Sequence, residues 1–570
     1  MQPLLSIKDL SIIFCHEGKQ VTAVNKISFN VSPGEIVAIV GESGSGKSVS
    51  ALSLLHLLPA NSSVTGEILF YKKEIGPINL LKLDEAGINN IRGKEISMIF
   101  QEPMTSLNPV FTCGNQVLEA IRLHQKLSRK AALRKTIELF ELVQLPDPET
   151  IMRRYPHQLS GGQKQRVMIA MAMSGNPSLL IADEPTTALD VTVQMAILQL
   201  IKKIQKQNNT GVIFITHDLG VVADIADKVI VMLNGEIVEK GNVKELFCLP
   251  QHPYTKALLA CRPANQPKGK RLQVVNDVII SSKIKDPGYP TTEELNIQPE
   301  IGEDRPVLSV KGLTVSFPVK QNLFGRASQF YTAVENLSFI VKKGETLGLV
   351  GESGSGKTTL GRAILQLIPY RSGEILLEGK DISKMNPAAL RNLRKDLQVI
   401  FQDPYGSLNP RMTIGKAILE PLKTHALFNN KESREKVMEI LEKVSISPDQ
   451  FNRYPHQFSG GQRQRICIAR ALILNPSFLI FDESVSALDV SVQAQVLNLL
   501  NDLKHEFNFT AIFISHDLSV VHYIADRIMV MYRGKIVEEG EAGEIYHHPK
   551  NEYTQKLISA IPGRNLIHSY

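Results

Sequence analysis

The sequence lacks long apolar runs. A membrane-spanning helix needs roughly 20 consecutive apolar residues, and no stretch of the 570-residue chain comes near that length. The N-terminal stretch MQPLLSIKDLSIIF also lacks a basic segment followed by a long apolar run, so we predict no secretory signal. These absences predict a chain that does not itself cross a membrane.

Cysteine is scarce, and no Cys-x-x-Cys pair occurs. The five cysteines are Cys15, Cys113, Cys248, Cys261 and Cys467. Their scatter argues against a disulfide framework and a zinc site and is typical of a protein in the reducing cytoplasm. An excess of one charge is also missing: 64 Lys and Arg face 57 Asp and Glu, for a net charge of +7. We interpret this modest basicity as a solvated surface and expect no nucleic-acid partner.

What the sequence does contain is a long internal repeat. GESGSGK begins at Gly41 and again at Gly351. Three further pairs lie 299 residues apart: Tyr155 and Tyr454 in YPHQLSGGQ and YPHQFSGGQ, Asp183 and Asp482 in two acidic motifs, and His217 and His516 in two THDL or SHDL motifs. A repeat this long indicates a duplicated domain, because the units of a solenoid run to roughly 20–50 residues.

The repeat predicts two domains joined by a linker. We place the first domain at residues 1–262, the linker at 263–305 and the second domain at 306–570. The linker is rich in proline, glycine and mixed charges. Within it, VVNDVII (Val274 to Ile280) has the composition of a short strand.

Both halves have the same predicted plan. A start rich in Val and Ile leads into a strand, a glycine-rich loop and a helix, and a helical stretch follows at residues 116–145 and 414–444. The later segments SLLIAD, GVIFIT, SFLIFD and TAIFIS are continuous apolar runs of strand length. Such runs alternating with helices predict an α/β fold built on a parallel sheet.

Two glycine-rich loops are the first motifs with a chemical function. Each follows an apolar strand and opens a helix, which is the context of a phosphate-binding loop. Glycines let backbone N–H groups surround phosphate. Lys47 and Lys357 would reach the β- and γ-phosphates of ATP, and the hydroxyls of Ser48 and Thr358 would bind Mg²⁺. The loop residues expected to hold ATP are Gly41, Glu42, Ser43, Gly44, Ser45, Gly46, Lys47 and Ser48, and Gly351, Glu352, Ser353, Gly354, Ser355, Gly356, Lys357, Thr358 and Thr359.

Two acid pairs form the second motif. Asp183-Glu184 and Asp482-Glu483 each end an apolar strand downstream of a loop. We expect each Asp to hold Mg²⁺ and each Glu to act as the general base toward the attacking water. An isolated pair of this kind is more often a solvated loop, and its position downstream of a phosphate-binding loop favours the catalytic interpretation.

A third set of motifs resembles the signature of one family. The SGGQ motifs open helices at Ser160, Gly161, Gly162 and Gln163 and at Ser459, Gly460, Gly461 and Gln462. Gln101 and Gln402 follow strands, and His217 and His516 follow the last core strands. In content and order these motifs resemble those of ATP-binding-cassette (ABC) ATPases, over almost the whole of both halves.

The resemblance implies a fold and two ATP sites that each take residues from both halves. Each half is then expected to have a RecA-like parallel-sheet core, an antiparallel β subdomain and a helical subdomain. In this family the signature of one domain caps the ATP held by the other, so the halves would pair. One composite site would join Lys47, Gln101, Glu184 and His217 with Ser459 to Gln462, and the other Lys357, Gln402, Glu483 and His516 with Ser160 to Gln163. The histidines would contact the γ-phosphate, and the glutamines would assist at Mg²⁺.

The adenine ring has several candidate partners. Phe14 and Phe317 occupy the place where the family stacks an aromatic ring on the base. Each also fits as an apolar strand residue. Tyr331 competes with Phe317 for the role in the second half.

Further features narrow the resemblance to dipeptide, oligopeptide and nickel importers. FQEPMTSLNP and FQDPYGSLNP follow the glutamines, YPHQ precedes both signatures, and HPYTKALLACRP and NEYTQKLISAIP follow the two domains in register. The single-chain fusion is particularly similar to the ATPases of microcin C and peptide importers. The resemblance implies two separate permease subunits, an indirect link to an extracytoplasmic substrate-binding protein, and a place on the cytoplasmic face of a bacterial membrane.

Two alternatives stay open at this point. An exporter ATPase would share the fold and chemistry, and a soluble tandem cassette would act on ribosomes or DNA. The second half also departs from the first, because Asp482 to Val485 reads DESV where the first half has DEPT. We expect hydrolysis at both sites, with more backbone freedom beside Glu483 because proline is absent.

Overall fold

The computed structural model divides the chain into two compact units. Unit 1 comprises Met1–Leu189, Val193–Leu259 and Pro562–Tyr570, and unit 2 comprises Asp190–Thr192 and Ala260–Ile561. The structure describes residues 2–16, 18–72, 76–101, 106–187, 189–265, 270–275, 306–321, 327–425, 427–486 and 488–564. Most of the predicted linker, and residues 276–280 of its expected strand, lie outside these ranges.

Unit 1 contains two sheets. The strands are β1 (Leu5–His16), β2 (Lys19–Val31), β3 (Ile36–Val40), β4 (Ser62–Lys72), β5 (Gly76–Asn79), β6 (Ile96–Ile99), β7 (Leu179–Asp183), β8 (Gly211–Thr216), β9 (Lys228–Leu233) and β10 (Glu236–Asn242). One sheet, of order β2-β1-β4-β5, is antiparallel. The other, of order β10-β9-β3-β8-β7-β6, is parallel except for the β9–β10 hairpin.

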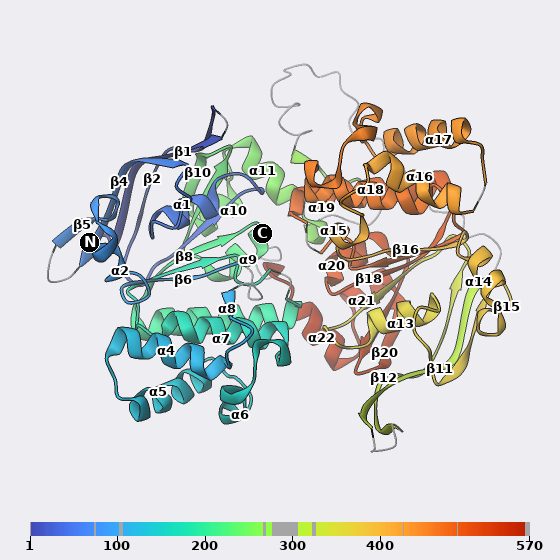
Figure 1. Ribbon diagram of the computed structural model, residues 1–570, viewed down its shortest axis with the longest axis horizontal. Helices are drawn as coiled ribbons and strands as arrows, with labels where there is room; N and C mark the ends of the chain where they lie inside the picture. The colour runs from blue at the N-terminus through green and yellow to red at the C-terminus, as the bar shows by residue number, and fades with distance from the viewer. Residues whose placement is uncertain are drawn as a thin grey trace. The chain divides into compact units, whose positions relative to one another are not determined.

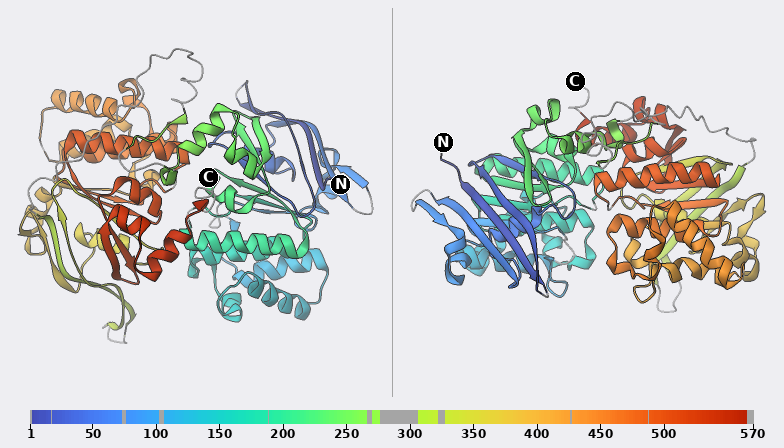
Figure 2. Two further views of the ribbon diagram at one scale, coloured as in Figure 1. Left: turned by 180° about the vertical axis from the view of Figure 1, so that it is seen from behind. Right: turned by 90° about the horizontal axis from the view of Figure 1, so that it is seen from above.

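The helices of this half follow the expected order. They are α1 (Lys47–Ser53), α2 (Glu85–Asn89), α4 (Cys113–Gln125), α5 (Arg129–Leu142), α6 (Pro148–Arg153), α7 (Gly161–Met173), α8 (Val191–Asn208), α9 (Leu219–Ile225), α10 (Val243–Cys248) and α11 (Pro253–Ala260), with 3₁₀ turns η1 (Leu80–Lys82) and η2 (Pro156–Gln158). Within unit 1, the α4–α6 helices gather on the opposite side from β1, β2 and β4 (Figure 1). The rear view of Figure 2 shows the same separation.

Unit 2 repeats this plan. Its strands are β11 (Pro306–Gln321), β12 (Ala327–Lys342), β13 (Thr346–Val350), β14 (Ser372–Leu377), β15 (Lys380–Asp381), β16 (Leu397–Ile400), β17 (Phe478–Asp482), β18 (Thr510–Ser515), β19 (Arg527–Tyr532) and β20 (Lys535–Glu541). The antiparallel sheet has the order β12-β11-β14-β15 and the largely parallel sheet the order β16-β17-β18-β13-β19-β20. The expected fold class is confirmed in both halves.

The helices of unit 2 follow a similar order along the chain. They are α13 (Lys357–Ile364), α14 (Pro387–Leu393), α15 (Pro404–Ser407), α16 (Ile414–Thr424), α17 (Asn430–Lys443), α18 (Gly460–Leu472), α19 (Val490–Phe507), α20 (Leu518–Ile524), α21 (Ala542–His547) and α22 (Glu552–Ser559), with 3₁₀ turns η3 (Pro263–Asn265), η4 (Ile382–Lys384), η5 (Pro448–Asn452) and η6 (Pro455–Gln457).

The two long helical stretches expected from the sequence are each divided into separate helices. In unit 1 the break falls at Lys126, which has a left-handed backbone with φ of 50°, and Ser128 then caps the start of α5. In unit 2, Asn429 caps the start of α17 with a side-chain and backbone capping box. Such caps satisfy the N–H groups that a helix start leaves unpaired, so two short helices replace one long one.

The central sheet of unit 1 has a hydrophobic core on each face. Strands β3, β7 and β8 are buried along their whole length. Successive residues of β7 pack into different cores: Leu179 and Ile181 lie with the antiparallel sheet, and Leu180 and Ala182 lie with the helical subdomain. This alternation follows from the two-residue period of a strand. It explains why the sequence shows continuous apolar runs in this sheet.

A short segment, residues 270–275, packs on the rest of unit 2. The Leu272 N–H donates to Asn498 Oδ1 at 2.9 Å, and Asn498 Nδ2 donates to the Leu272 carbonyl at 2.8 Å. The Tyr523 hydroxyl donates to the Lys270 carbonyl at 3.0 Å. Leu272 and Asn498 are 2% and 3% exposed. The Asn498 amide therefore pairs with both the backbone N–H and the backbone carbonyl of buried Leu272, as the backbone of a neighbouring strand would.

Asn498→Leu is expected to release this segment. The substitution removes both partners of Leu272, and leaving such groups buried and unpaired costs roughly 1–3 kcal/mol each. Hydrogen–deuterium exchange of peptides covering residues 270–275 should become at least about 10-fold faster. A free-energy change of about 1.4 kcal/mol alters an equilibrium constant tenfold. Gln199→Leu, at the exposed position 299 residues earlier, is the matched control. Unchanged exchange in Asn498→Leu would contradict the assignment.

Candidate functional site

Each glycine-rich loop connects the central strand to a helix. In unit 1 the loop runs between β3 and α1, and Gly46 has a left-handed backbone with φ of 96°. A Cβ atom at Gly46 would lie 2.6 Å from the Ala23 carbonyl oxygen, and one at Gly356, where φ is 106°, would lie 2.3 Å from the Ala333 carbonyl oxygen. Both backbone conformation and space therefore require glycine before each loop lysine.

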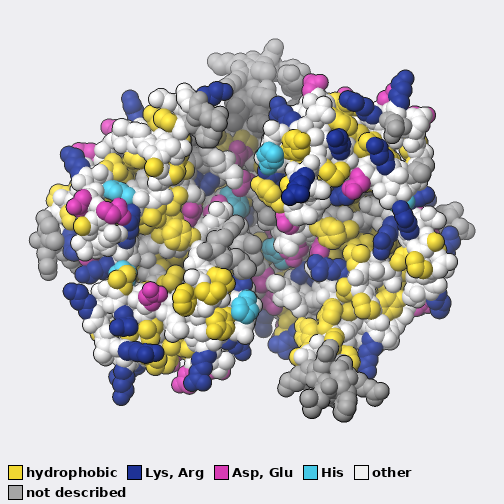
Figure 3. All heavy atoms as spheres, viewed as in Figure 1, with side chains coloured by type: hydrophobic (Ala, Val, Ile, Leu, Met, Phe, Trp, Pro, Cys, Tyr) yellow, Lys and Arg dark blue, Asp and Glu magenta, His cyan; other side chains and the backbone are white. Residues whose placement is uncertain are grey.

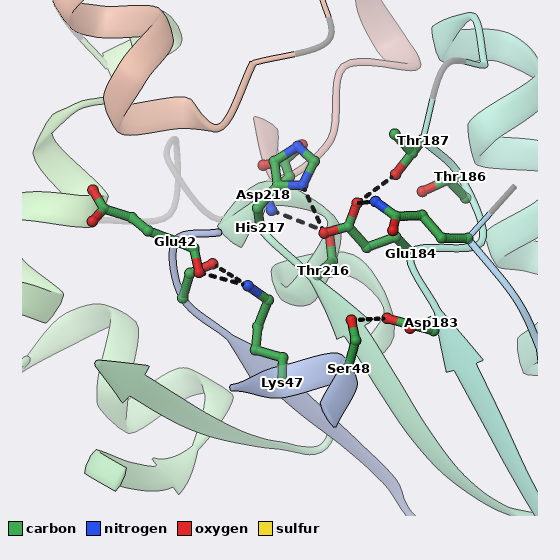
Figure 4. A network of polar contacts seen from close by, with 12 residues as sticks. Glu42, Lys47, Ser48, Asp183, Glu184, Thr186, Thr187, Thr216, His217 and Asp218 are labelled. Atoms are coloured by element: carbon green, nitrogen blue, oxygen red, sulfur yellow. Dashed lines mark hydrogen bonds and ion pairs between the residues drawn. The ribbon is translucent and has the colours of Figure 1, made fainter. Parts of the chain in front are cut away.

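The loop lysines turn back onto their own loops. Lys47 Nζ donates to the carbonyl oxygens of Gly41 and Glu42 at 2.8 and 2.9 Å, as Figure 4 shows. Lys357 Nζ donates in the same way to Gly351 and Glu352 at 2.7 and 2.8 Å. The Glu42 carboxylate points away from the lysine in Figure 4. Burial lowers the pKa of Lys357, because desolvation disfavours a buried cation.

The hydroxyl after each lysine meets the first acid of its unit. Ser48 Oγ donates to Asp183 Oδ1 at 2.9 Å, and Thr358 Oγ1 donates to Asp482 Oδ1 at 2.9 Å. Burial raises the pKa of Asp183 to about 6, with the Ser48 hydrogen bond acting in the opposite direction. Burial likewise raises the pKa of Asp482. The predicted metal-binding pairs Ser48–Asp183 and Thr358–Asp482 are thus brought together.

Glu184 is held on both carboxylate oxygens. Gln101 Nε2 and Thr187 Oγ1 donate to Glu184 Oε2 at 2.9 and 3.0 Å, and His217 Nδ1 lies 3.3 Å from Oε1 (Figure 4). Burial by itself would raise the pKa of Glu184, but the His217 contact and the Thr187 hydrogen bond lower it to about 2. The carboxylate is therefore ionised at neutral pH, which is the form that a general base requires.

Glu483 has a similar environment with one difference. Gln402 Nε2 donates to Glu483 Oε2 at 3.0 Å, and His516 Nδ1 lies 3.4 Å from the same oxygen. Burial opposes the His516 contact here too, and the net effect lowers the pKa of Glu483. Ser486, the counterpart of Thr187, donates to the backbone carbonyl of Glu483 at 2.9 Å. The hydroxyl at this position in unit 2 therefore contacts the backbone of Glu483 and not its carboxylate.

Both glutamates have an unusual backbone. Glu184 has φ of 46° and Glu483 has φ of 49°, in the left-handed region that residues other than glycine seldom adopt. Their N–H groups donate to the Ile215 and Ile514 carbonyls at 2.9 and 3.0 Å. The backbone of Glu483 matches that of Glu184, although proline is absent after it. The expectation of more backbone freedom beside Glu483 stays a prediction.

The SGGQ motifs begin α7 and α18 as capping boxes. Ser160 Oγ accepts from the Gln163 N–H at 3.3 Å, and Gln163 Oε1 accepts from the Ser160 N–H at 3.1 Å. Ser459 and Gln462 repeat the arrangement at 3.4 and 3.0 Å. The serine and glutamine side chains therefore fix the first turn of each helix.

The aromatic candidates lie on the antiparallel sheets. Phe14 is partly buried in β1. Phe317 of β11 is directly opposite Tyr331 of β12, and the two are 38% and 56% exposed. Opposed residues on neighbouring antiparallel strands share one face of the sheet. The two candidates of the second half therefore form one exposed aromatic pair, and the choice between them as the adenine partner stays a prediction.

Thr187 is a site residue that the motifs did not identify. It follows Glu184 by three residues in a tight turn and reaches the carboxylate through its hydroxyl. Its position inside DEPTT was visible in the sequence. The available signal was a hydroxyl side chain three residues after Glu184, although Ser486, at the same place in unit 2, contacts the backbone of Glu483 instead.

Comparisons with known proteins show which family the chain belongs to. The family model described as "ABC transporter" matches residues 24–187 and 334–486, and that described as "Oligopeptide/dipeptide transporter, C-terminal region" matches residues 238–281 and 537–565. The chain belongs to the ABC transporter family. It is an ATPase subunit of the oligopeptide/dipeptide type, and the resemblance inferred from the sequence is confirmed.

Curated relatives share this layout over almost the whole chain. The "Glutathione import ATP-binding protein GsiA" of Salmonella choleraesuis is 50% identical over 563 residues, covering 98% of this chain and 89% of that protein. Its counterpart in Escherichia coli K12 is 49% identical over 561 residues, with the same coverage of each chain. A solved dimeric ATP-binding cassette, MJ0796 with ADP and Pi bound, is 27% identical over 41% of this chain and 98% of that one, with a TM-score of 0.37.

Across the part of the chain that the structure describes, no helix combines the length and apolarity that crossing a membrane needs. Independently of this, membership among the ATPase subunits of this family implies permease partners.

Proposed function

We propose that this chain powers the import of small peptides or peptide-like solutes through two separate permease subunits. The observation that carries the proposal is the double set of site residues, with an oligopeptide-type C-terminal region after each set. Relatives that are about half identical over nearly the whole chain are named as import proteins for glutathione, a tripeptide. Import at the cytoplasmic face of a bacterial membrane, with an extracytoplasmic binding protein delivering the solute, follows from this proposal.

Each unit supplies the groups that ATP and Mg²⁺ require. The Lys47 and Lys357 ammonium groups would move from loop carbonyls to the β- and γ-phosphates. The hydroxyl–carboxylate pairs Ser48–Asp183 and Thr358–Asp482 offer hard oxygen donors 2.9 Å apart, which suits Mg²⁺ bound mainly by water and phosphate. When bound, Mg²⁺ would neutralise charge on the phosphates. Gln101 and Gln402 would assist at the same metal ion.

Glu184 and Glu483 would remove the proton from the attacking water. Both carboxylates are ionised and oriented by an amide and a histidine. General-base catalysis needs this combination of protonation state and fixed direction. His217 and His516, with one ring nitrogen toward the glutamate, would present the other toward the γ-phosphate.

Complete sites would require both units. We propose that Ser160 to Gln163 cap the nucleotide held by the second loop, and that Ser459 to Gln462 cap the nucleotide held by the first. Support comes from the exposed starts of α7 and α18, because a helix N-terminus has free N–H donors and favours anions. ATP would then close the two halves, and hydrolysis would let them separate and move the permease between its two states.

Exposed apolar side chains in the helical subdomains could contact the permeases. After Gln101, Val110 and Phe111 are 70% and 53% exposed, and after Gln402, Tyr405 is 63% exposed. Tyr405 also lines a cavity of unit 2 with Leu408, Met412, Ala417, Glu420 and Arg470. Figure 3 shows hydrophobic side chains interspersed with charged ones on the visible face, where the Lys and Arg side chains are scattered and form no single patch. We propose that these helical subdomains receive the permeases.

Copurification tests the transport role. Tagged chain taken from detergent-solubilised membranes is expected to recover two permease proteins. Val110→Ser combined with Phe111→Ser should reduce that recovery while ATP binding persists, because both side chains are exposed and their loss removes apolar contact area from the docking surface. Leu249→Ser, at another site that is 72% exposed, is the matched control. Recovery with ribosomes in place of permeases would overturn the proposal, and ATP-driven efflux in vesicles would replace import by export.

A further inference from the structure

The segment after each domain has a contact that the proposed roles do not explain. HPYT lies at the start of α11 and NEYT at the start of α22, and each motif carries a tyrosine, Tyr254 or Tyr553. The Tyr254 hydroxyl accepts a hydrogen bond from the Glu42 backbone N–H at 3.0 Å. The Tyr553 hydroxyl accepts one from the Glu352 N–H, also at 3.0 Å. The same contact thus reaches the phosphate-binding loop in both units.

These hydrogen bonds hold one peptide group from its two sides. The Glu42 N–H belongs to the peptide that carries the Gly41 carbonyl, and this carbonyl accepts from Lys47 Nζ at 2.8 Å. In unit 2 the Gly351 carbonyl accepts from Lys357 Nζ at 2.7 Å. Because a peptide group is planar, fixing its N–H fixes the direction of its carbonyl. The tyrosine hydroxyl therefore determines where the loop presents an acceptor to its lysine.

The tyrosines are themselves held by the rest of the unit. Glu239 of β10 accepts from the Gln251 and His252 N–H groups at 2.7 and 3.1 Å, and His252 Nδ1 accepts from the Tyr254 N–H at 3.2 Å. Tyr254 is fully buried, at 0% exposure. A strand, a helix start and the tyrosine thus form one continuous connection to the loop.

Unit 2 repeats the connection with other residues. Glu538 of β20 accepts from the Lys550 and Asn551 N–H groups at 2.7 and 3.1 Å, and Asn551 Oδ1 accepts from the Tyr553 N–H at 2.9 Å. The Tyr553 ring packs on Tyr532 of β19 with centroids 4.3 Å apart. His252 and Asn551 differ chemically, yet each serves as the acceptor. The connection from the strand to the loop is therefore the same in both units, although the residue that accepts the tyrosine N–H differs.

We propose that Tyr254 and Tyr553 are positioning residues for nucleotide binding, acting on the loop lysines through the shared peptide group. The C-terminal region of the oligopeptide type would then contribute to the ATP site of its own unit. This inference rests on the proposed assignment of Lys47 and Lys357 to phosphate binding. A phenylalanine ring could pack in the same place, so this role explains why each ring carries a hydroxyl.

Tyrosine-to-phenylalanine substitution tests the hydroxyl alone. In the full chain, Tyr254→Phe combined with Tyr553→Phe keeps both rings and removes both acceptors. The KM for ATP is expected to rise roughly 3- to 10-fold, the effect of losing a hydrogen bond of ordinary strength. The kcat should change little, because an interaction present in both ground and transition states affects KM alone. Equilibrium binding of ADP should weaken by the same factor.

Two controls separate the possible outcomes. Tyr370→Phe removes a buried hydroxyl that has no hydrogen-bond partner among the described residues, and it should leave KM unchanged. If the double variant melts earlier but keeps its KM and ADP affinity, the tyrosines are only structural and the inference is overturned. Lys47→Ala with Lys357→Ala tests the underlying assignment independently. If those variants bind ATP normally, the proposed function of the loops fails, whatever the tyrosines show.

Discussion

Glu184→Gln combined with Glu483→Gln is expected to lower ATP turnover by about 10²- to 10⁴-fold, the usual contribution of a general base. Nucleotide affinity should stay near that of the wild type. Glutamine has almost the same size as glutamate and can keep a hydrogen bond to Gln101 or Gln402. It lacks the ionised oxygen that would take a proton from water. The expected loss therefore falls on kcat.

The environments of the two glutamates sharpen this expectation. The pKa of Glu184 is lowered to about 2, so this carboxylate stays ionised as the pH falls from 8 to 5, and the pKa of Glu483 is lowered too. The turnover of the wild type should therefore show no loss in that range from protonation of Glu184. Rates of phosphate release, measured at saturating ATP across that range, provide both readouts.

Single variants and a control decide between the two sites. Glu483→Gln alone should remove at least the contribution of its own site, and full turnover would show that the second-site assignment is wrong. Thr187→Val is the matched control for Glu184, because it removes one hydrogen bond at 3.0 Å and leaves the carboxylate ionised. It should cost much less activity than Glu184→Gln. An equal loss of turnover in Thr187→Val and Glu184→Gln would indicate that the position of the Glu184 side chain matters and that its proton acceptance does not.

Much of the fold was predictable because its signals are local. Strand β3, IVAIV, is a continuous apolar run that ends in a glycine-rich loop, and its five residues are all buried. The two-unit plan followed from the repeat. The helix break at Lys126 was harder to place, since a lysine in the left-handed region is not a typical helix end. The cap at Ser128 that begins the next helix does have a sequence signature.

The site was only partly predictable because several of its contacts are non-local. Gln101, Glu184 and His217 were each identified, and the structure brings them together. The left-handed backbone of Glu184 depends on a hydrogen bond to Ile215 on a neighbouring strand, which no local pattern encodes. Tyr254 reaches Glu42 across 212 residues of sequence. Its motif was noticed in the sequence, but its target required the folded chain.

Lys47→Ala combined with Lys357→Ala is expected to weaken nucleotide binding by roughly 10- to 100-fold. Hydrogen bonds to a charged group contribute about 1.5–3 kcal/mol, and each lysine is the cation that its loop offers to the phosphates. Each side chain is almost completely buried, at 6% and 4% exposure. A buried ammonium group released from loop carbonyls needs little reorganisation to meet a phosphate. Equilibrium titration with a fluorescent ATP analogue measures the loss.

Single lysine variants connect this loss to one loop at a time. Wild-type chain should bind two nucleotides, whereas Lys47→Ala or Lys357→Ala should retain one high-affinity site. Lys311→Ala is the matched control, because that lysine forms an exposed surface pair with Glu374 and such pairs contribute little. Lys47→Met and Lys357→Met keep an apolar stem, so a shared defect across Ala and Met variants points to the charge. Two nucleotides bound at wild-type affinity in the double Met variant would show that the loops act without their lysines.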